Sequence, residues 1–203
     1  MDTPGSFARL NAALLLAGGV LLAGVAALSY AMAHDLGEVL TRNTIRLALA
    51  WYAAALILML QLDARGWAAA TPVGRIARWC WTWAVVVFLV HLAMAFHFYH
   101  DWSHADAFER TRQVSGAGEG IYTSYLFTLL WVGDAAWWWV RPAAYAARSP
   151  WIDRGLHAFM LFIVFNGTIV YEDGAIRVAG IVMFVAFAAA WYLARGAARL
   201  RPA

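Results

Sequence analysis

Residues 81–104 read WTWAVVVFLVHLAMAFHFYHDWSH, an apolar run that passes directly into a group of histidines. The run extends back to residue 76, and the stretch 76–98 contains no proline or glycine. A helix needs about 20 mostly apolar residues to cross a bilayer. The stretch therefore predicts a membrane-crossing helix with a polar, histidine-rich continuation at one end.

Five more apolar stretches accompany it, at 10–33, 44–62, 121–140, 155–171 and 175–194. The chain of 203 residues is 64% hydrophobic and 13% charged, whereas soluble domains average about 45–50% and about 25%. The stretches are rich in Ala and Leu and do not alternate with polar residues, which argues against membrane strands. We expect a single all-α transmembrane domain over 1–203, a bundle of six transmembrane helices.

The arginines predict how this bundle is oriented. All 15 basic residues are Arg, and with six spans ten of them fall on the side that holds both termini and five on the other. Cytoplasmic loops carry the excess of positive charge. We therefore expect an inner-membrane protein with both termini in the cytoplasm and the histidine-rich loop 99–120 on the extracytoplasmic face.

The same arginines bear on binding partners. They are scattered over loops and do not form the basic stripe of a nucleic-acid-binding protein. The expected partners are therefore the lipid bilayer and, in one alternative, other membrane subunits.

The first span ends in a sequence that resembles a signal-peptidase site, Ala31-Met32-Ala33 before His34. A signal peptide has an apolar core of about 7–15 residues, and this run is longer. We therefore expect residues 1–33 to be retained. In the alternative, cleavage would leave His34 at the N-terminus, where its amine and imidazole would chelate copper together. Intact-mass measurement distinguishes the two.

The histidine-rich continuation predicts a metal site. If the third helix runs on to about residue 112, then His97, His100, Asp101 and His104 fall within an arc of about 100°, at about 100° per residue. Imidazole binds zinc, copper, iron and nickel. We expect a transition metal at these residues, copper or zinc rather than iron.

The helix rise limits this site. His97 and His104 lie two turns apart, about 10 Å, whereas a metal–nitrogen bond measures about 2.0–2.1 Å. One helix therefore supplies only half of a site, and we expect His34 and a carboxylate to complete it. In the alternatives, the same ridge is an interface for a partner subunit or is simply solvated.

Three polar residues are expected inside the bilayer, namely Asp134, His91 and Asn166. His91 and Asn166 have similar depth, so we expect a hydrogen bond between them. Asp134 lies nearer to Arg154 and His157, which would neutralise it. Such residues either join helices by polar contacts, worth about 0.6 kcal/mol on average, or form a proton or ion path.

A haem is the less favoured cofactor. It would use His91 or His97 as one axial ligand, and His34 near the outer edge would be the second. His157 lies at the wrong end of the bundle to pair with any of them. The residues thus predict at most one haem at the outer edge.

Together these observations predict an integral inner-membrane protein with a His/carboxylate transition-metal site on its extracytoplasmic face, serving metal handling or metal-dependent chemistry. One alternative is a non-catalytic structural or assembly subunit of a membrane complex. The other is a small transporter that uses Asp134, His91 and Asn166.

Overall fold

A computed structural model of the protein describes residues 4–199, and this part of the chain is all-α. Five long α-helices and a helix with a π-helical end form its framework. They are α1 (Pro4–Met32), α2 (Leu36–Met59), α4 (Pro72–Tyr99), α6 (Gly120–Val140), α8 (Pro150–Phe165) with its continuation η1 (Asn166–Val170), and α9 (Gly174–Arg199). The shorter helices are α3 (Ala64–Trp67), α5 (His104–Ser115) and α7 (Pro142–Ala146).

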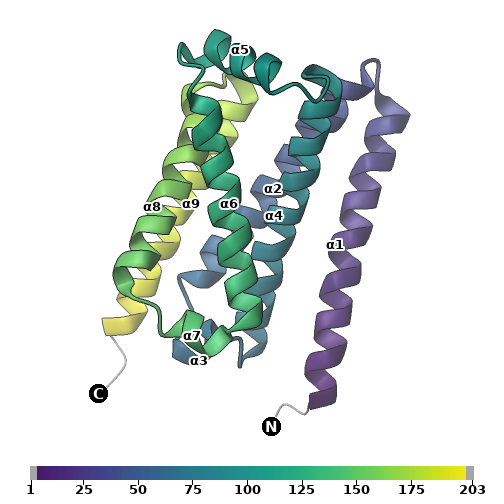
Figure 1. Ribbon diagram of the computed structural model, residues 1–203. Helices are drawn as coiled ribbons and strands as arrows, with labels where there is room; N and C mark the ends of the chain where they lie inside the picture. Colours follow the sequence, from purple (N-terminus) through teal and green to yellow (C-terminus); the bar gives the residue numbers. More distant parts are fainter. Residues whose placement is uncertain (1–3, 200–203) are drawn as a thin grey trace.

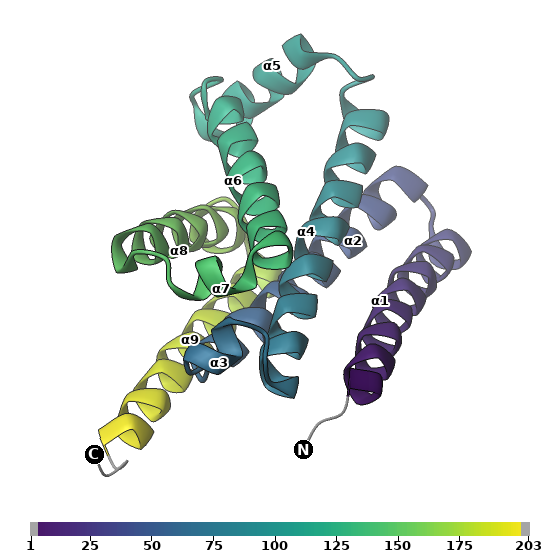
Figure 2. The ribbon, with the colours of Figure 1, turned by 60° about the horizontal axis from the view of Figure 1, so that its bottom comes forward.

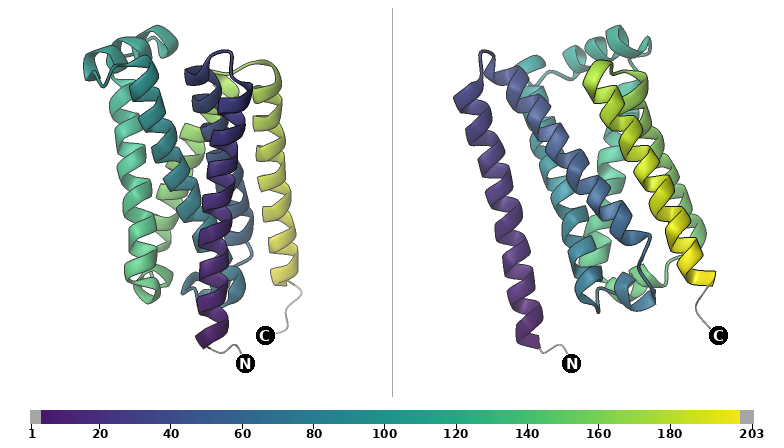
Figure 3. Two further views of the ribbon diagram at one scale, coloured as in Figure 1. Left: turned by 90° about the vertical axis from the view of Figure 1, so that its right-hand side faces the viewer. Right: turned by 180° about the vertical axis from the view of Figure 1, so that it is seen from behind.

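The long helices lie side by side as a bundle (Figure 1). The first turn of α1 and the last turn of α9 lie at the same end, together with α3 and α7, while α5 lies across the opposite end. When the end with α3 and α7 is turned toward the viewer, α2 and α4 are seen packed together, with α1 set apart on one side (Figure 2). The view from behind shows the same separation of α1 (Figure 3, right).

Three helical segments of the described chain are long and apolar enough to cross a membrane: Gly5–Met32, Pro72–Tyr99 and Gly174–Gly196. Only 11% of the first and last of these is buried inside the protein, so most of their apolar surface faces outward. The predicted all-α class is confirmed, and the three helices indicate a membrane protein.

Side-chain caps fix where several helices begin. The carboxylates of Asp35 and Asp63 accept hydrogen bonds from the amides of Glu38 (3.0 Å) and Gly66 (2.8 Å), satisfying donors that have no partner within the helix. Thr71 caps α4 in the same way. Proline follows the cap of α4, α7 and α8, where its fixed φ suits the first helical turn.

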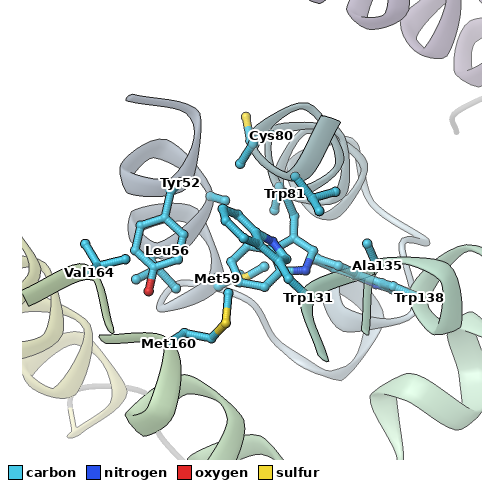
Figure 4. Close-up of a cluster of buried hydrophobic side chains, with 14 of the residues drawn as sticks. Tyr52, Leu56, Met59, Cys80, Trp81, Trp131, Ala135, Trp138, Met160 and Val164 are labelled. Carbon is cyan, nitrogen blue, oxygen red and sulfur yellow. The ribbon is translucent and has the colours of Figure 1, made fainter. Parts of the chain in front are cut away.

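The main core lies between α2, α4, α6 and α8, and its centre is aromatic (Figure 4). The ring centroids of Tyr52 and Trp131 lie 5.6 Å apart, those of Trp81 and Trp131 5.3 Å, and those of Tyr52 and Trp81 5.7 Å. All three side chains are buried. Each ring buries a large apolar area, and tilted or edge-on ring pairs add further stabilisation.

The third long helix does not run on to residue 112, so the expectation of one continuous helix is wrong. Helix α4 ends at Tyr99, and α5 begins only at His104. Between them Asp101 (φ 44°) and Trp102 (φ 59°) take left-handed backbone conformations. The Trp102 amide bonds back to the Phe96 carbonyl (3.0 Å).

The new helix has its own cap. The Ser103 hydroxyl accepts from the Asp106 amide at 3.2 Å and so starts α5 separately. Local hydrogen bonds of this kind compete with helix continuation even where no proline or glycine intervenes.

Candidate functional site

The structure does not gather the predicted metal ligands. His34, His97, Asp101 and His104 are exposed, and His100 is half-buried at the turn after α4. Because the helix breaks at this turn, His97, His100, Asp101 and His104 no longer share one helical face. Within residues 4–199 there is no group of three or more His, Cys, Asp or Glu side chains that could hold a metal ion.

Two of these histidines have other neighbours. The Nδ1 atom of His104 lies 2.9 Å from the Tyr125 hydroxyl, and its ring lies 5.7 Å from that of Tyr122. Burial, with the positive charge of Arg110 nearby, lowers the pKa of His100 and favours its neutral form. The arrangement gives no support to the predicted metal site.

The expected hydrogen bond between His91 and Asn166 is not formed. The Nδ1 atom of His91 lies 2.9 Å from the carbonyl oxygen of Thr41, which can only accept, so Nδ1 carries the proton. The amide of Asn166 donates to the Phe162 carbonyl one turn back, at 2.7 Å. Haem ligation by His91 is untested by this geometry and stays a prediction.

A buried polar site lies around Asp134 of α6, at the end of the bundle opposite α5. Its Oδ2 atom accepts hydrogen bonds from the Trp81 indole and from the Tyr145 hydroxyl, each at 2.9 Å. Its Oδ1 atom pairs with Nη1 of Arg148 at 3.0 Å. The side chains of this ion pair are only 5% and 4% exposed. The expected partner Arg154 is therefore wrong, since Arg148 neutralises this carboxylate.

Arg148 also joins Asp134 to a second carboxylate. Its Nε atom donates to Oδ1 of Asp153 at 3.2 Å, and its Nη2 atom pairs with the same oxygen. The Nε2 atom of His157 lies 3.6 Å from that oxygen, one turn along α8. We call these four residues, Asp134, Arg148, Asp153 and His157, the charge cluster. His157 thus lies beside Asp153, and the predicted neutralisation of Asp134 by His157 is replaced by the ion pair with Arg148.

Aromatic rings enclose the guanidinium of the charge cluster. Its carbon lies 3.8 Å from the ring centre of Tyr145 and 5.4 Å from that of Trp67. The ring of Trp138 stacks on Tyr145 at 4.9 Å and donates a hydrogen bond to the Trp67 carbonyl (2.8 Å). Burial lowers the pKa of Arg148, but Tyr145 and the carboxylates outweigh it and raise the pKa overall, so the guanidinium stays charged.

The charge cluster carries two carboxylates and one guanidinium, so it lacks one positive charge when His157 is neutral. Both ring nitrogens of His157 are shielded from solvent and have no hydrogen-bond partner within the described chain. A buried polar group in that position is costly unless it gains a proton or a partner. The Asp153 side chain is 38% exposed, so solvent shares in stabilising its charge, and a proton on His157 would face this carboxylate at 3.6 Å.

Above the charge cluster lie two more buried polar groups and a cavity. The hydroxyl of Tyr52 and the indole nitrogen of Trp131 have no hydrogen-bond partner among the described residues. Trp131 also lines a cavity of about 290 Å³, together with His91, Thr168 and Glu172. Polar groups thus continue from the charge cluster through the aromatic core toward the end of the bundle where α5 lies.

Sequence reasoning identified Asp134 and His157 but missed Arg148, Tyr145 and Trp81. Arg148 reads as one more arginine of a short loop, and no spacing rule relates it to a carboxylate fourteen positions earlier. The pairing arises because the chain turns back through α7, which places Tyr145 and Arg148 against α6. No local pattern carries that information.

The chain matches no protein-family model, and the searches of curated proteins and of solved structures returned no match.

Proposed function

We propose that this is an inner-membrane protein with six membrane-spanning helices and cytoplasmic termini, and that it carries protons across the bilayer through the charge cluster. The observation that supports the proposal is the missing positive charge beside His157. Ionisable residues inside a membrane protein are costly to keep, and functional sites are where they are usually retained.

A proton is the simplest carrier of the missing charge. On His157 it would face the Asp153 carboxylate at 3.6 Å, a distance that a small side-chain rotation shortens to a hydrogen bond. Loss of this proton would return the charge cluster to a net negative charge, with Arg148 still paired to both carboxylates. The site would therefore alternate between two charge states within one packed framework.

The second part of the proposed path is the cavity that His91 and Glu172 line. Its volume of about 290 Å³ accommodates several water molecules, each of which takes about 30 Å³. Glu172 is exposed and follows η1, so it can exchange protons with the extracytoplasmic solution. Between this cavity and the charge cluster lie the Tyr52 hydroxyl, which can both accept and donate, and the indoles of Trp131 and Trp81, which can only donate. Water molecules beside the Tyr52 hydroxyl would therefore have to carry the proton past the two indoles.

Proton flux into sealed vesicles tests the proposal. The purified protein is reconstituted with a pH-sensitive dye inside, and a potassium diffusion potential drives the protons. We expect flux above that of empty vesicles, and a loss of at least tenfold in His157→Gln and Asp153→Asn. His97→Gln, an exposed histidine at the other end of the bundle, is the matched control and should keep the flux. Folded protein that conducts no better than empty vesicles would end the proposal.

The same preparation tests the metal hypothesis. Copper or zinc that copurifies at one ion per chain, and that is lost in His100→Ala but not in His157→Ala, would restore a site at the turn after α4. Proton flux through the charge cluster needs no such ion, so the two experiments give independent answers.

A further inference from the structure

A further cavity lies outside both parts of the proposed proton path. Its volume is about 490 Å³, and it lies where α5, α6 and η1 meet, at the end of the bundle opposite the charge cluster. Arg110 and Thr111 of α5 and Asn166 of η1 contribute polar groups to its wall, and Val114 and Phe162 contribute apolar ones. We propose that it binds an anionic phospholipid, with the phosphate at Arg110 and one acyl chain between α6 and α8.

The charge of Arg110 is available for a ligand. The neighbouring Arg112 is held by Glu109 at 2.7 Å, and Arg42 by Glu38 at 3.1 Å. Within the described chain Arg110 has no such ion pair. It is thus a free guanidinium at the mouth of a largely apolar cavity, and a guanidinium is well suited to bind a phosphate group through two parallel hydrogen bonds.

A second cavity gives the proposed acyl chain a place to lie. It has a volume of about 350 Å³ and lies between the same two helices, farther from α5. Its wall is made by apolar side chains and by glycines on both helices. These residues are Leu129, Leu130, Gly133, Trp137, Ile152, Gly155, Leu156 and Phe159, with Asp134 beside them.

Two glycines show that this second cavity is an open apolar groove between α6 and α8. A Cβ atom added at Gly133 or at Gly155 would meet no atom within 4 Å. Phe162, which lines the first cavity, is 60% exposed on the outer surface of α8, so the cavity communicates with the lipid phase. From Ser124 to Gly133 the helix rises about 14 Å, at about 1.5 Å per residue, which suits much of one acyl chain.

The combination of the Arg110 guanidinium with an apolar groove favours a phospholipid over a free anion. A soluble phosphate compound would use Arg110 and the polar wall but would leave the apolar groove unfilled. A zwitterionic lipid would fill the groove but would bring a positive group close to Arg110. A lipid with a net negative head satisfies both ends of the site.

Native mass spectrometry of the whole protein in detergent tests the site. The protein is titrated with phosphatidylglycerol, with phosphatidylcholine of the same chains, and with inorganic phosphate. We expect one phosphatidylglycerol to bind at least tenfold more tightly than phosphatidylcholine, and phosphate alone not to bind. Equal binding of the two lipids, or tight binding of phosphate alone, would overturn the proposal.

Two pairs of variants locate the bound lipid. Arg110→Gln should weaken phosphatidylglycerol binding about tenfold, as expected for one charge-assisted contact. Arg112→Gln, the same change two residues along α5, should leave it unchanged. Gly155→Leu should block the acyl chain, and Gly24→Leu in α1, which also faces open space, should not. Equal losses within either pair would show that the lipid binds elsewhere.

Discussion

Arg148 satisfies two carboxylates at once while only 4% of its side chain is exposed. Removing one partner of a buried ion pair typically costs about 3–5 kcal/mol, because the remaining charge is left without compensation. Replacing Arg148 by methionine would leave Asp134 and Asp153 as two uncompensated acids near each other. Loss of this one side chain would thus leave two charges without their partner.

We expect Arg148→Met to lower the free energy of unfolding by about 3 kcal/mol or more, measured by denaturation in mixed micelles. Arg154→Met is the control, because Arg154 is exposed and only approaches the Trp151 ring at 5.8 Å. A change of less than 1 kcal/mol in Arg148→Met would show that the ion pair does not stabilise the fold.

Asp101 offers a test that separates the observed turn from a continuous helix. Its φ of 44° is a conformation that glycine adopts without strain. Asp101→Gly should therefore leave stability unchanged or raise it by up to about 1 kcal/mol. In an uninterrupted helix the same change would cost about 0.3 kcal/mol, because glycine has a slightly lower helix propensity than aspartate. Thermal unfolding of the two proteins side by side decides between these outcomes.

Glu109 gives a pH prediction outside the membrane-spanning segments. Hydrogen bonds from Arg112 and Gln113 lower its pKa from 4.5 to about 2. Because the folded-state pKa is depressed, the contribution of this pair to stability is complete above about pH 4.5 and is lost as the pH falls through about 2. The carboxyl carbon resonance of Glu109 should titrate near pH 2, and in Arg112→Gln its midpoint should move upward.

At the scale of the helices, α1 shows how close packing depends on a missing side chain. A Cβ atom at Gly18 would lie 2.0 Å from the Trp83 ring. The Trp83 indole also donates a hydrogen bond to the Leu14 carbonyl at 3.1 Å. Gly18 therefore allows α1 to approach α4 closely enough for this bond to form.

We expect Gly18→Ala to lower the free energy of unfolding by about 1–3 kcal/mol, because the bulky ring must shift or the helix must move away. Gly24→Ala, on the same helix with nothing within 4 Å of its added Cβ, should stabilise α1 slightly through helix propensity. If the two variants unfold alike, the close contact between α1 and α4 does not exist in the membrane.

The helices also show how far sequence reasoning reached. The apolar stretch 44–62 corresponds to α2, which begins eight residues earlier at Leu36 because Asp35 caps it. Hydrophobicity locates the apolar part of a helix and does not detect the polar turns that precede it. The break at 100–103 was missed for a related reason, since it depends on backbone bonds to Phe96 and on the Ser103 cap.

At the scale of the whole molecule, the testable property is the six-span topology. With Cys80 replaced by Ser, single cysteines are placed at Ala105 in α5 and at Ala144 in α7, both exposed positions at opposite ends of the bundle. In intact cells a membrane-impermeant thiol reagent should label the cysteine at 105 and leave that at 144 unlabelled until the membrane is opened. Labelling of both in intact cells would contradict the proposed topology.

Helix α1 is joined to the other helices by a few polar contacts. Trp79 donates to Asn11 at 3.1 Å, Trp83 to Leu14, and Asn43 to Ser29 at 2.9 Å. In hydrocarbon no water competes for these groups, so the three directional bonds, together with the packing of Gly18 against Trp83, fix the rotation of α1. A nick at residues 33–35 would turn α1 into a separate peptide that stays docked like a subunit, and its exchange with added synthetic α1 would measure how firmly those bonds hold.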